Sequence, residues 1–201
     1  MNKLHLKIGL TGNLGTGKST VAKLMEKYGA KVLDADKVVH QLLERKDIKE
    51  KLLQTLGRDI LTIEGKVDRK KVAERVFKDR PILKWLEELL HPLVYEEFEK
   101  FCTREGGICV LEAALIFENK NQNRFHYTIL VYAPKEVAKR RAMQRGMSEE
   151  DFNRRWERQM DIEVKKTLAD FVIDNSKSLE ETEKQVRGLM YRFNQELKRF
   201  C

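Results

Sequence analysis

The octet GNLGTGKS at residues 12–19 decides the fold, and it directly follows an apolar run at Leu6–Leu10. It fits the pattern Gly-x-x-x-x-Gly-Lys-Ser/Thr in full, and the residues after it have helical periodicity. Glycine lets backbone N–H groups approach an anion closely, and the start of the helix adds the positive end of its dipole. The sequence therefore predicts a phosphate-binding loop for a nucleoside triphosphate. A glycine-rich turn without a ligand is the alternative.

The residue types in this loop indicate their roles. We expect Lys18 to contact the β- and γ-phosphates of ATP, and the Ser19 hydroxyl to bind Mg²⁺. Other residues of the loop and of the first helical turn are also expected to bind ATP. These are Gly15, Thr16, Gly17 and Thr20.

The composition narrows the choice of partner. The 201 residues are enough for one domain with a sizeable core, and 36% of them are charged, with a net charge of +8. A basic chain favours an anionic partner, which could be a phosphate-rich substrate or a nucleic acid, but a solvated basic surface without a partner gives the same charge. The sequence leaves the oligomeric state open.

The cysteines and the N-terminus bear on the compartment. Cys102, Cys109 and Cys201 have no metal-ligand spacing, and so few of them fit reduced thiols. The first apolar run is too short for a signal peptide or a membrane span. We expect a cytoplasmic protein without a membrane partner.

Short apolar runs alternate with longer helical patterns along the chain. Their near-continuous apolarity is typical of strands covered on both faces, which predicts a doubly wound α/β domain with a mainly five-stranded parallel sheet. The strands are expected at Leu6–Leu10, Lys31–Leu33, Ile108–Leu111, Thr128–Tyr132 and Phe171–Ile173, and the helices at 18–28, 37–46, 48–56, 68–78, 81–104, 134–145, 148–166 and 177–199.

Several details of the helices can be predicted too. Pro92 should break the long helix near His91, and Ser148 should cap the next-to-last helix. The region 36–106 should form a helical substrate-binding subdomain, with Phe77 and Trp85 in its core. The apolar stripe in 179–200 should be the packing face of a terminal helix.

Polar side chains follow each strand of the predicted sheet, where the carboxyl ends of parallel strands meet and ligands bind. Such a set of carboxylates and arginines beside a phosphate-binding loop suits phosphoryl transfer. In order of the strands, they are Asp34 and Asp36, Glu112, Arg141 with Arg145, and Asn175.

The carboxylates have competing interpretations. Either Asp34 or Asp36 could take the proton of an acceptor hydroxyl, and we favour Asp36 because it lies further from the strand. Asp34 could instead cap the next helix. Glu112 could hold a magnesium-bound water, or it could be an ordinary surface carboxylate. His91 is a candidate substrate contact, although a structural hydrogen bond would also explain it.

The arginines suggest a mobile lid. Arg141 and Arg145 lie one helical turn apart and share a face, and a planar guanidinium suits a transferring phosphoryl group. Arg154, Arg155 and Arg158 follow nearby, so this basic segment could close over the nucleotide and exclude water. A solvated helix is the alternative, above all for Arg155 and Arg158.

The whole chain resembles the dephospho-coenzyme A kinase family over residues 5–185. The resemblance rests on an ordered set of segments: IGLTGNLGTGKST (8–20), DAD (34–36), LHPLV (90–94), VLEAALIFE (110–118) and ADFVIDNS (169–176). It implies transfer of the ATP γ-phosphoryl group to the ribose 3′-hydroxyl of dephospho-CoA, with ATP and dephospho-CoA as substrates and Mg²⁺ as cofactor.

Residue roles follow from the resemblance by position. It implies Lys18 as the loop lysine, Asp36 as the base, Arg141 as the active-site arginine, and Asn175 at the adenine of ATP. It also makes 36–106 the CoA-binding region and 141–165 the lid. The residues expected to contact the substrate are Asp34, Asp36, His91 and Glu112. The chain departs from the family at Asn13, where glycine is common, and we expect this to be harmless because asparagine tolerates left-handed backbone.

Other functions fit the same fold. A nucleoside or nucleotide monophosphate kinase would use the same chemistry on another acceptor. A GTPase is disfavoured, because Asn119–Gln122 lacks the final aspartate of a guanine-binding motif. An ATP-dependent nucleic-acid-binding protein would explain the charge, but no basic patch is interleaved with aromatic residues, so no nucleic-acid partner is expected.

Overall fold

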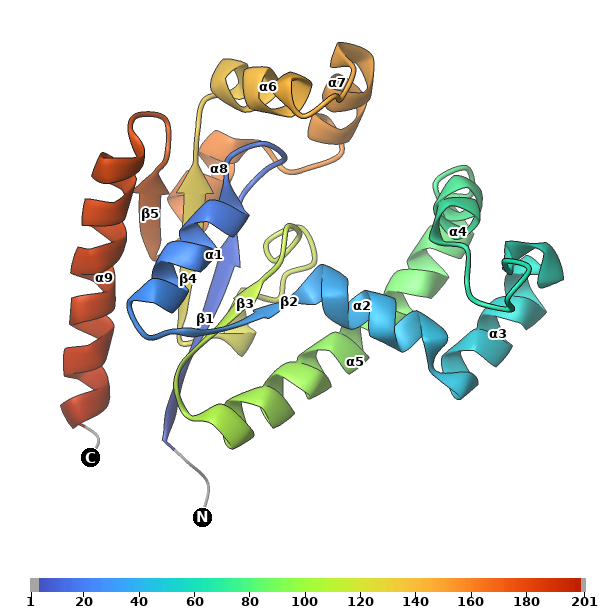
Figure 1. Cartoon of the computed structure of the whole chain (residues 1–201), viewed down its shortest axis with the longest axis horizontal. Helices are drawn as coiled ribbons and strands as arrows, with labels where there is room; N and C mark the ends of the chain where they lie inside the picture. Colours follow the sequence, from blue (N-terminus) through green and yellow to red (C-terminus); the bar gives the residue numbers. More distant parts are fainter. Residues whose placement is uncertain (1–3, 200–201) are drawn as a thin grey trace. The chain divides into compact units, whose positions relative to one another are not determined.

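A computed structural model describes residues 4–199 of the chain (Figure 1). The chain divides into two compact units. One is formed by the two ends of the chain, up to Asp34 and from Phe101 onward, and the other by Ala35–Lys100.

The first unit contains a five-stranded sheet in which every strand pair is parallel, in the order β2-β3-β1-β4-β5. This confirms the predicted fold class. Because β1 lies in the middle, the loop that follows it lies at the centre of the carboxyl edge. The strands are β1 (His5–Thr11), β2 (Lys31–Asp34), β3 (Gly107–Glu112), β4 (Tyr127–Tyr132) and β5 (Phe171–Asp174).

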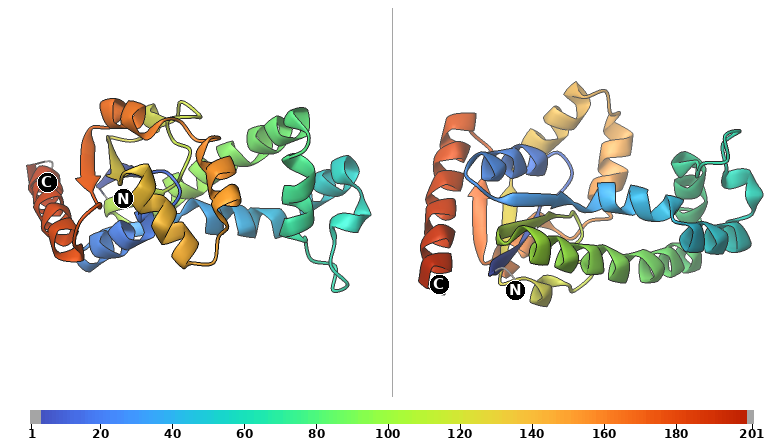
Figure 2. Two further views of the ribbon diagram at one scale, coloured as in Figure 1. Left: turned by 90° about the horizontal axis from the view of Figure 1, so that it is seen from above. Right: turned by 60° about the horizontal axis from the view of Figure 1, so that its bottom comes forward.

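Two helices, α1 (Lys18–Lys27) and α9 (Leu179–Arg199), lie side by side on one face of this sheet (Figure 1). Both views of Figure 2 show α9 running beside β5. Alternate side chains of β1 point into this layer and are buried, and Val186, Met190 and Phe193 of α9 pack there as well. The predicted apolar stripe of the terminal helix is thereby confirmed as far as residue 199; residue 200 lies outside the described range.

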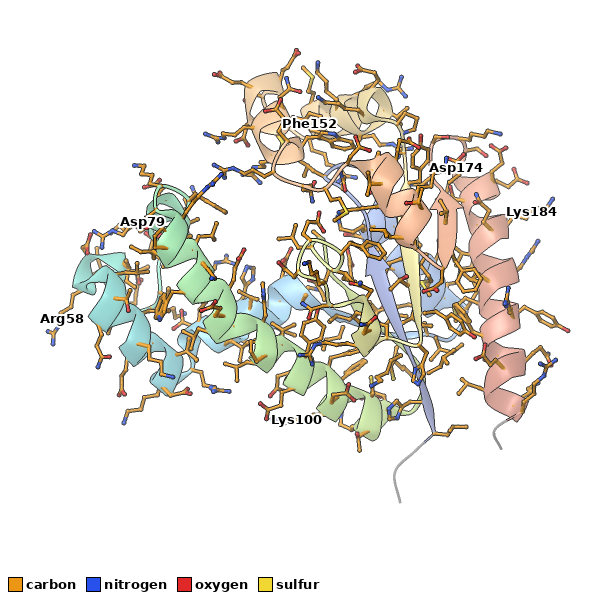
Figure 3. All side chains as sticks on the ribbon, turned by 180° about the vertical axis from the view of Figure 1, so that it is seen from behind. Arg58, Asp79, Lys100, Phe152, Asp174 and Lys184 are labelled. Atoms are coloured by element: carbon orange, nitrogen blue, oxygen red, sulfur yellow. The ribbon has the colours of Figure 1, made fainter. Side chains whose placement is uncertain are left out.

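Three helices, α6 (Lys135–Gln144), α7 (Glu149–Trp156) and α8 (Ile162–Leu168), form a second cluster with Leu130 of β4. Phe152 of α7 is fully buried in it, on the side towards α6 (Figure 3). Gly9 of β1 faces away from α1 and α9, and a Cβ there would lie 2.8 Å from the Phe125 ring. This close approach explains a glycine in the middle of a buried strand.

The single helix predicted over 148–166 is wrong, because α7 ends at Trp156 and α8 begins at Ile162. The Ser148 cap is confirmed, since its side chain accepts from the backbone N–H of Asp151. A second cap starts α8: the carboxylate of Asp161 accepts from Glu163 N at 2.7 Å. Met160 between them makes its hydrogen bonds outside any helix.

The second unit is helical. Its core consists of apolar side chains from four helices and a short 3₁₀ turn at Arg58–Ile60, among them Leu42, Leu52, Ile60, Val72 and Leu90. The helices are α2 (Ala35–Glu44), α3 (Lys46–Leu56), α4 (Arg69–Val76) and α5 (Arg80–Glu105), of which α5 belongs to this unit as far as Lys100.

The break predicted at Pro92 is wrong, because α5 continues through it. A proline inside a helix costs about 3 kcal/mol. Leu90, Val94 and Phe98 are buried at four-residue spacing on both sides of Pro92, and burial of each contributes about 1.5–3 kcal/mol. Continuous packing therefore outweighs the lost hydrogen bond.

The predicted aromatic core of this unit is only partly correct. Phe77 is 54% exposed, so its expected place in the core is wrong, and Trp85 is half-buried. Phe77 is the cap residue that ends α4, and the apolar face of that helix is already formed by Val72 and Val76.

Cys102 and Cys109 are buried free thiols, whereas Cys201 lies outside the described residues. Within residues 4–199, no helix is both long enough and apolar enough to cross a bilayer.

Candidate active site

The phosphate-binding loop runs from the end of β1 to the start of α1 and depends on two glycines with left-handed backbone. Gly15 has φ 79° and Gly17 has φ 94°. A side chain at Gly15 would collide with the carbonyl oxygen of Ala138 in α6, and one at Gly17 would collide with the Asn175 amide. The loop is therefore packed from two sides against the elements that follow β4 and β5.

The start of α1 is arranged to receive an anion. Gly17 is its N-cap and offers no side-chain hydrogen bond to the first turn, so N–H groups there can bind a phosphate. Thr16 is fully buried and donates from its hydroxyl to Asn13 O at 2.8 Å, which fixes the turn. Lys18 Nζ donates to Gly12 O at 2.8 Å, so its ammonium group lies over the loop.

Ser19 and Glu112 form an oxygen-rich pair at the carboxyl edge of the sheet. The Ser19 hydroxyl donates to Glu112 Oε1 at 2.8 Å. Glu112 ends β3, in register with Leu10 of β1 on one side and with Asp34 of β2 on the other. Hydroxyl and carboxylate oxygens are ligands that Mg²⁺ prefers, together with substrate phosphates and water. These residues fit a phosphate-bound Mg²⁺; residues 4–199 contain no group of three or more His, Cys, Asp or Glu that could hold a metal by itself.

A pocket of about 150 Å³ lies next to the phosphate-binding loop. Its lining carries three cationic side chains and no carboxylate. Together with the N-terminus of α1, this gives a positive potential suited to an anionic ligand. The lining residues are Gly17, Thr20, Arg141, Arg145, Asn175, Lys177 and Leu179.

Arg141 is the most distinctive residue of this pocket. It lies in the last turn of α6, is half-buried, and its Nη1 is a buried donor without a partner in the described part of the chain. Burial lowers the pKa of the Arg141 guanidinium, and the positive charges of Arg140 and Arg145 lower it further. An unsatisfied buried donor is costly, and a bound phosphate would satisfy it.

Asn175 connects the loop to the end of β5, which is marked by Asp174 in Figure 3. Its Nδ2 donates to Thr16 O at 2.7 Å, and its Oδ1 accepts from the Thr182 hydroxyl at 2.9 Å. The side chain is 94% buried, since only 6% is exposed. Its amide thus supports the loop, and a contact with adenine stays a prediction.

The structure gathers one part of the predicted site and leaves the other untested. The pocket beside the phosphate-binding loop is lined by five of the predicted residues: Gly17, Thr20, Arg141, Arg145 and Asn175. Asp36 is an exposed residue in the first turn of α2, and His91 is half-buried inside α5. Both belong to the unit formed by Ala35–Lys100, and their roles stay predictions.

The predicted lid residues have local partners. Arg154 and Arg155 both form ion pairs with Asp151 in the same helix, and their side chains are more than half exposed. This pairing is what a solvated helix face would show, so the lid stays a prediction.

Sequence reasoning missed Lys177 and Leu179, although both lie within the four residues that follow Asn175. It also gave the wrong reason for Asn13. This residue does not adopt a positive φ; instead it is fully buried, and its Nδ2 donates to Met160 O at 3.0 Å. Its role is a long-range hydrogen bond that one sequence could not reveal.

Comparisons with known proteins agree on one family. A family model described as dephospho-CoA kinase matches residues 6–181. The dephospho-CoA kinase of Aquifex aeolicus is 50% identical over 184 residues, which cover 90% of this chain and 94% of that one.

Two solved structures are similar to this chain, and one of them is described as a dephospho-CoA kinase. A crystal structure from Thermus thermophilus has a TM-score of 0.83 at 37% identity and covers 94% of this chain and 98% of its own. The dephospho-CoA kinase of Campylobacter jejuni has a TM-score of 0.63 at 27% identity, with 94% and 97% covered. The family model spans most of the chain and the Aquifex relative is half identical to it, so this chain belongs to the dephospho-CoA kinase family.

Proposed function

We propose that this protein transfers the γ-phosphoryl group of ATP to the ribose 3′-hydroxyl of dephospho-CoA, the last step of coenzyme A synthesis. The observation that carries the ATP half is the cationic pocket beside the phosphate-binding loop, with the unpartnered Nη1 of Arg141. The acceptor half is supported by membership of the family.

The loop and the arginine divide the charge of the triphosphate between them. N–H groups at the start of α1 hold the phosphates, and the Lys18 ammonium turns from Gly12 O towards the β- and γ-phosphate oxygens. Arg141 donates to the transferring group, where its charge is needed most in the transition state. Arg145 and Lys177 add positive charge at the pocket rim.

The acceptor hydroxyl must lose a proton as it attacks. The carboxylate of Asp36 accepts that proton, the hydroxyl oxygen bonds to the γ-phosphorus, and the bond to the bridging oxygen of ADP breaks. We assign Asp36 rather than Asp34 because Asp34 ends β2 in register with Glu112, closer to the Mg²⁺ ligands. The region 36–106, which includes His91, is the one that we propose holds the CoA substrate.

Mg²⁺ would be held by the Ser19 hydroxyl, with Glu112 accepting a hydrogen bond from one of its waters. When bound, it neutralises charge on the β- and γ-phosphates. The region 141–165 acts as the lid, because it carries Arg141, whose side chain lines the pocket beside the phosphate-binding loop. Few cysteines, two of them buried and free, support a cytoplasmic location.

A direct test offers ATP and Mg²⁺ with dephospho-CoA, AMP, CMP and a nucleoside in parallel, and follows ADP release. We expect dephospho-CoA to be the preferred acceptor by at least tenfold in kcat/KM. Lys18→Ala should abolish transfer, whereas Lys23→Ala, an exposed lysine on the same helix, serves as the matched control. Preference for a nucleoside monophosphate, or normal turnover by Lys18→Ala, would contradict the proposal.

A further inference from the structure

A buried ion pair lies close to the phosphate-binding loop, and the mechanism above does not use it. Lys165 of α8 has a fully buried side chain, and its Nζ lies 2.7 Å from Glu118 Oε1. Glu118 follows β3 and is itself mostly buried, with a side chain 16% exposed. Burial lowers the pKa of the Lys165 ammonium, while the neighbouring carboxylate raises it. Burying two charges is expensive, so a hydrophobic pair would stabilise the fold at least as well.

The same carboxylate oxygen is linked to the phosphate-binding loop through the backbone of one residue. Glu118 Oε1 accepts from Met160 N at 2.9 Å, and Met160 O accepts from Asn13 Nδ2 at 3.0 Å. Asn13 is completely buried, and it is the second residue of the loop octet. Glu118 and Asn13 therefore both bind the backbone of Met160, Glu118 at its N–H and Asn13 at its C=O.

Three further hydrogen bonds join the same segments. Leu14 N donates to Gln159 Oε1 at 2.8 Å, next to Met160. Ala114 O accepts from both Lys165 Nζ at 3.2 Å and the Thr11 hydroxyl at 3.1 Å. The ion pair and these hydrogen bonds together link α8, the segment before it and the loop after β3. Each of these links ends at residues 11–14, at the end of β1 and the start of the phosphate-binding loop.

We propose that Lys165 and Glu118 are positioning residues for ATP, which hold the phosphate-binding loop in its binding shape through the backbone of Met160 and the side chain of Asn13. Neither side chain contacts the substrate. Lys165 orients the carboxylate, the carboxylate holds Met160 N, and Met160 O holds Asn13, so that the N–H groups of the loop need no rearrangement when phosphate binds. This inference rests on the proposed use of ATP, but not on the identity of the acceptor.

Two double variants separate positioning from plain stability. Both remove the two charges, which avoids an uncompensated buried ion. Lys165→Met with Glu118→Gln keeps an amide oxygen that can accept from Met160 N, whereas Lys165→Met with Glu118→Leu removes that acceptor. The affinity for a fluorescent ATP analogue is measured in the full chain without any acceptor, beside the thermal melting temperature and the KM for dephospho-CoA.

We expect the glutamine variant to bind the ATP analogue within about threefold of the unmodified chain. The leucine variant should bind it about tenfold more weakly, the fold-change that one lost hydrogen bond corresponds to. Its KM for dephospho-CoA should stay unchanged, which distinguishes a positioning role from general loosening. Equal ATP affinities in the two double variants would overturn the proposal, whatever their melting temperatures.

A single variant keeps the test decisive if the leucine variant does not fold. Gln159→Met removes the acceptor of Leu14 N from a half-buried position, and it should weaken ATP analogue binding several-fold at an unchanged melting temperature. Lys166→Met is the matched control for the Lys165 substitution of the double variants, because it removes an equal charge from the next position of α8 and an exposed pair with Glu163. Full ATP affinity in Gln159→Met would overturn the inference. If the unmodified chain binds the ATP analogue but phosphorylates no acceptor, only the proposed function is contradicted.

Discussion

Arg141→Met should abolish most of the activity without destabilising the protein. The guanidinium can form two charge-assisted hydrogen bonds to a phosphoryl group, each contributing about 1.5–3 kcal/mol. A loss of about 4 kcal/mol corresponds to about 10³-fold in kcat/KM. The buried Nη1 of Arg141 has no partner within residues 4–199, and burial lowers the pKa of its guanidinium. Removing the guanidinium should therefore leave the free energy of unfolding unchanged or raise it by about 1 kcal/mol.

Three measurements check this prediction together: coupled ADP release, denaturant unfolding without ligand, and the rise in melting temperature on adding ATP and Mg²⁺. The control is Arg140→Met, an exposed arginine on the same helix, which should keep both activity and the ATP-induced rise. A loss of tenfold or less in Arg141→Met would remove it from the transition state. A clear fall in unfolding free energy would show that it supports the fold instead.

Three further changes test other parts of the site. Asp36→Asn should lower kcat by about 10²–10⁴-fold, the usual contribution of a general base, with little change in the KM for ATP; an unchanged kcat would exclude Asp36 as the base. Ser19→Ala removes the hydroxyl that contacts Glu112, so it should need a much higher Mg²⁺ concentration for half-maximal rate than Ser19→Thr does. Equal Mg²⁺ concentrations for the two variants would refute the metal assignment. Burial lowers the pKa of His91 below its ordinary 6.5. As the pH falls, the unfolded chain therefore takes up a proton at His91 before the folded chain does, and the free energy of unfolding decreases. His91→Gln should flatten this slope between pH 7.5 and 5, and an unaltered slope in urea unfolding would show that His91 does not contribute.

The fold could be predicted from the sequence because local patterns and global topology agree. Each apolar run lies in a strand, and the octet at 12–19 lies between the central strand and the first helix. The errors came where tertiary contacts outweigh local preference. Pro92 continues a helix because buried residues flank it, and the segment before α8 leaves the helix because Glu118 and Asn13 bind the backbone N–H and C=O of Met160.

The site was predictable to the extent that it follows the carboxyl edge of the sheet. That rule placed Arg141, Arg145 and Asn175 near the loop, where the structure gathers them around one pocket. It could not place Lys165, which looks like any helical lysine in the sequence yet is fully buried. Partners more than forty residues apart leave no local signal, so the Lys165 and Glu118 pair needed the structure.

The position of the new phosphate on the product tests the central claim most directly. The full chain is incubated with ATP, Mg²⁺ and dephospho-CoA, and the product is examined by ³¹P NMR. The account predicts a new phosphomonoester whose phosphorus couples to the ribose H3′ proton, formed in equal amount to ADP. Phosphate on any other oxygen, or ADP released with inorganic phosphate alone, would contradict it.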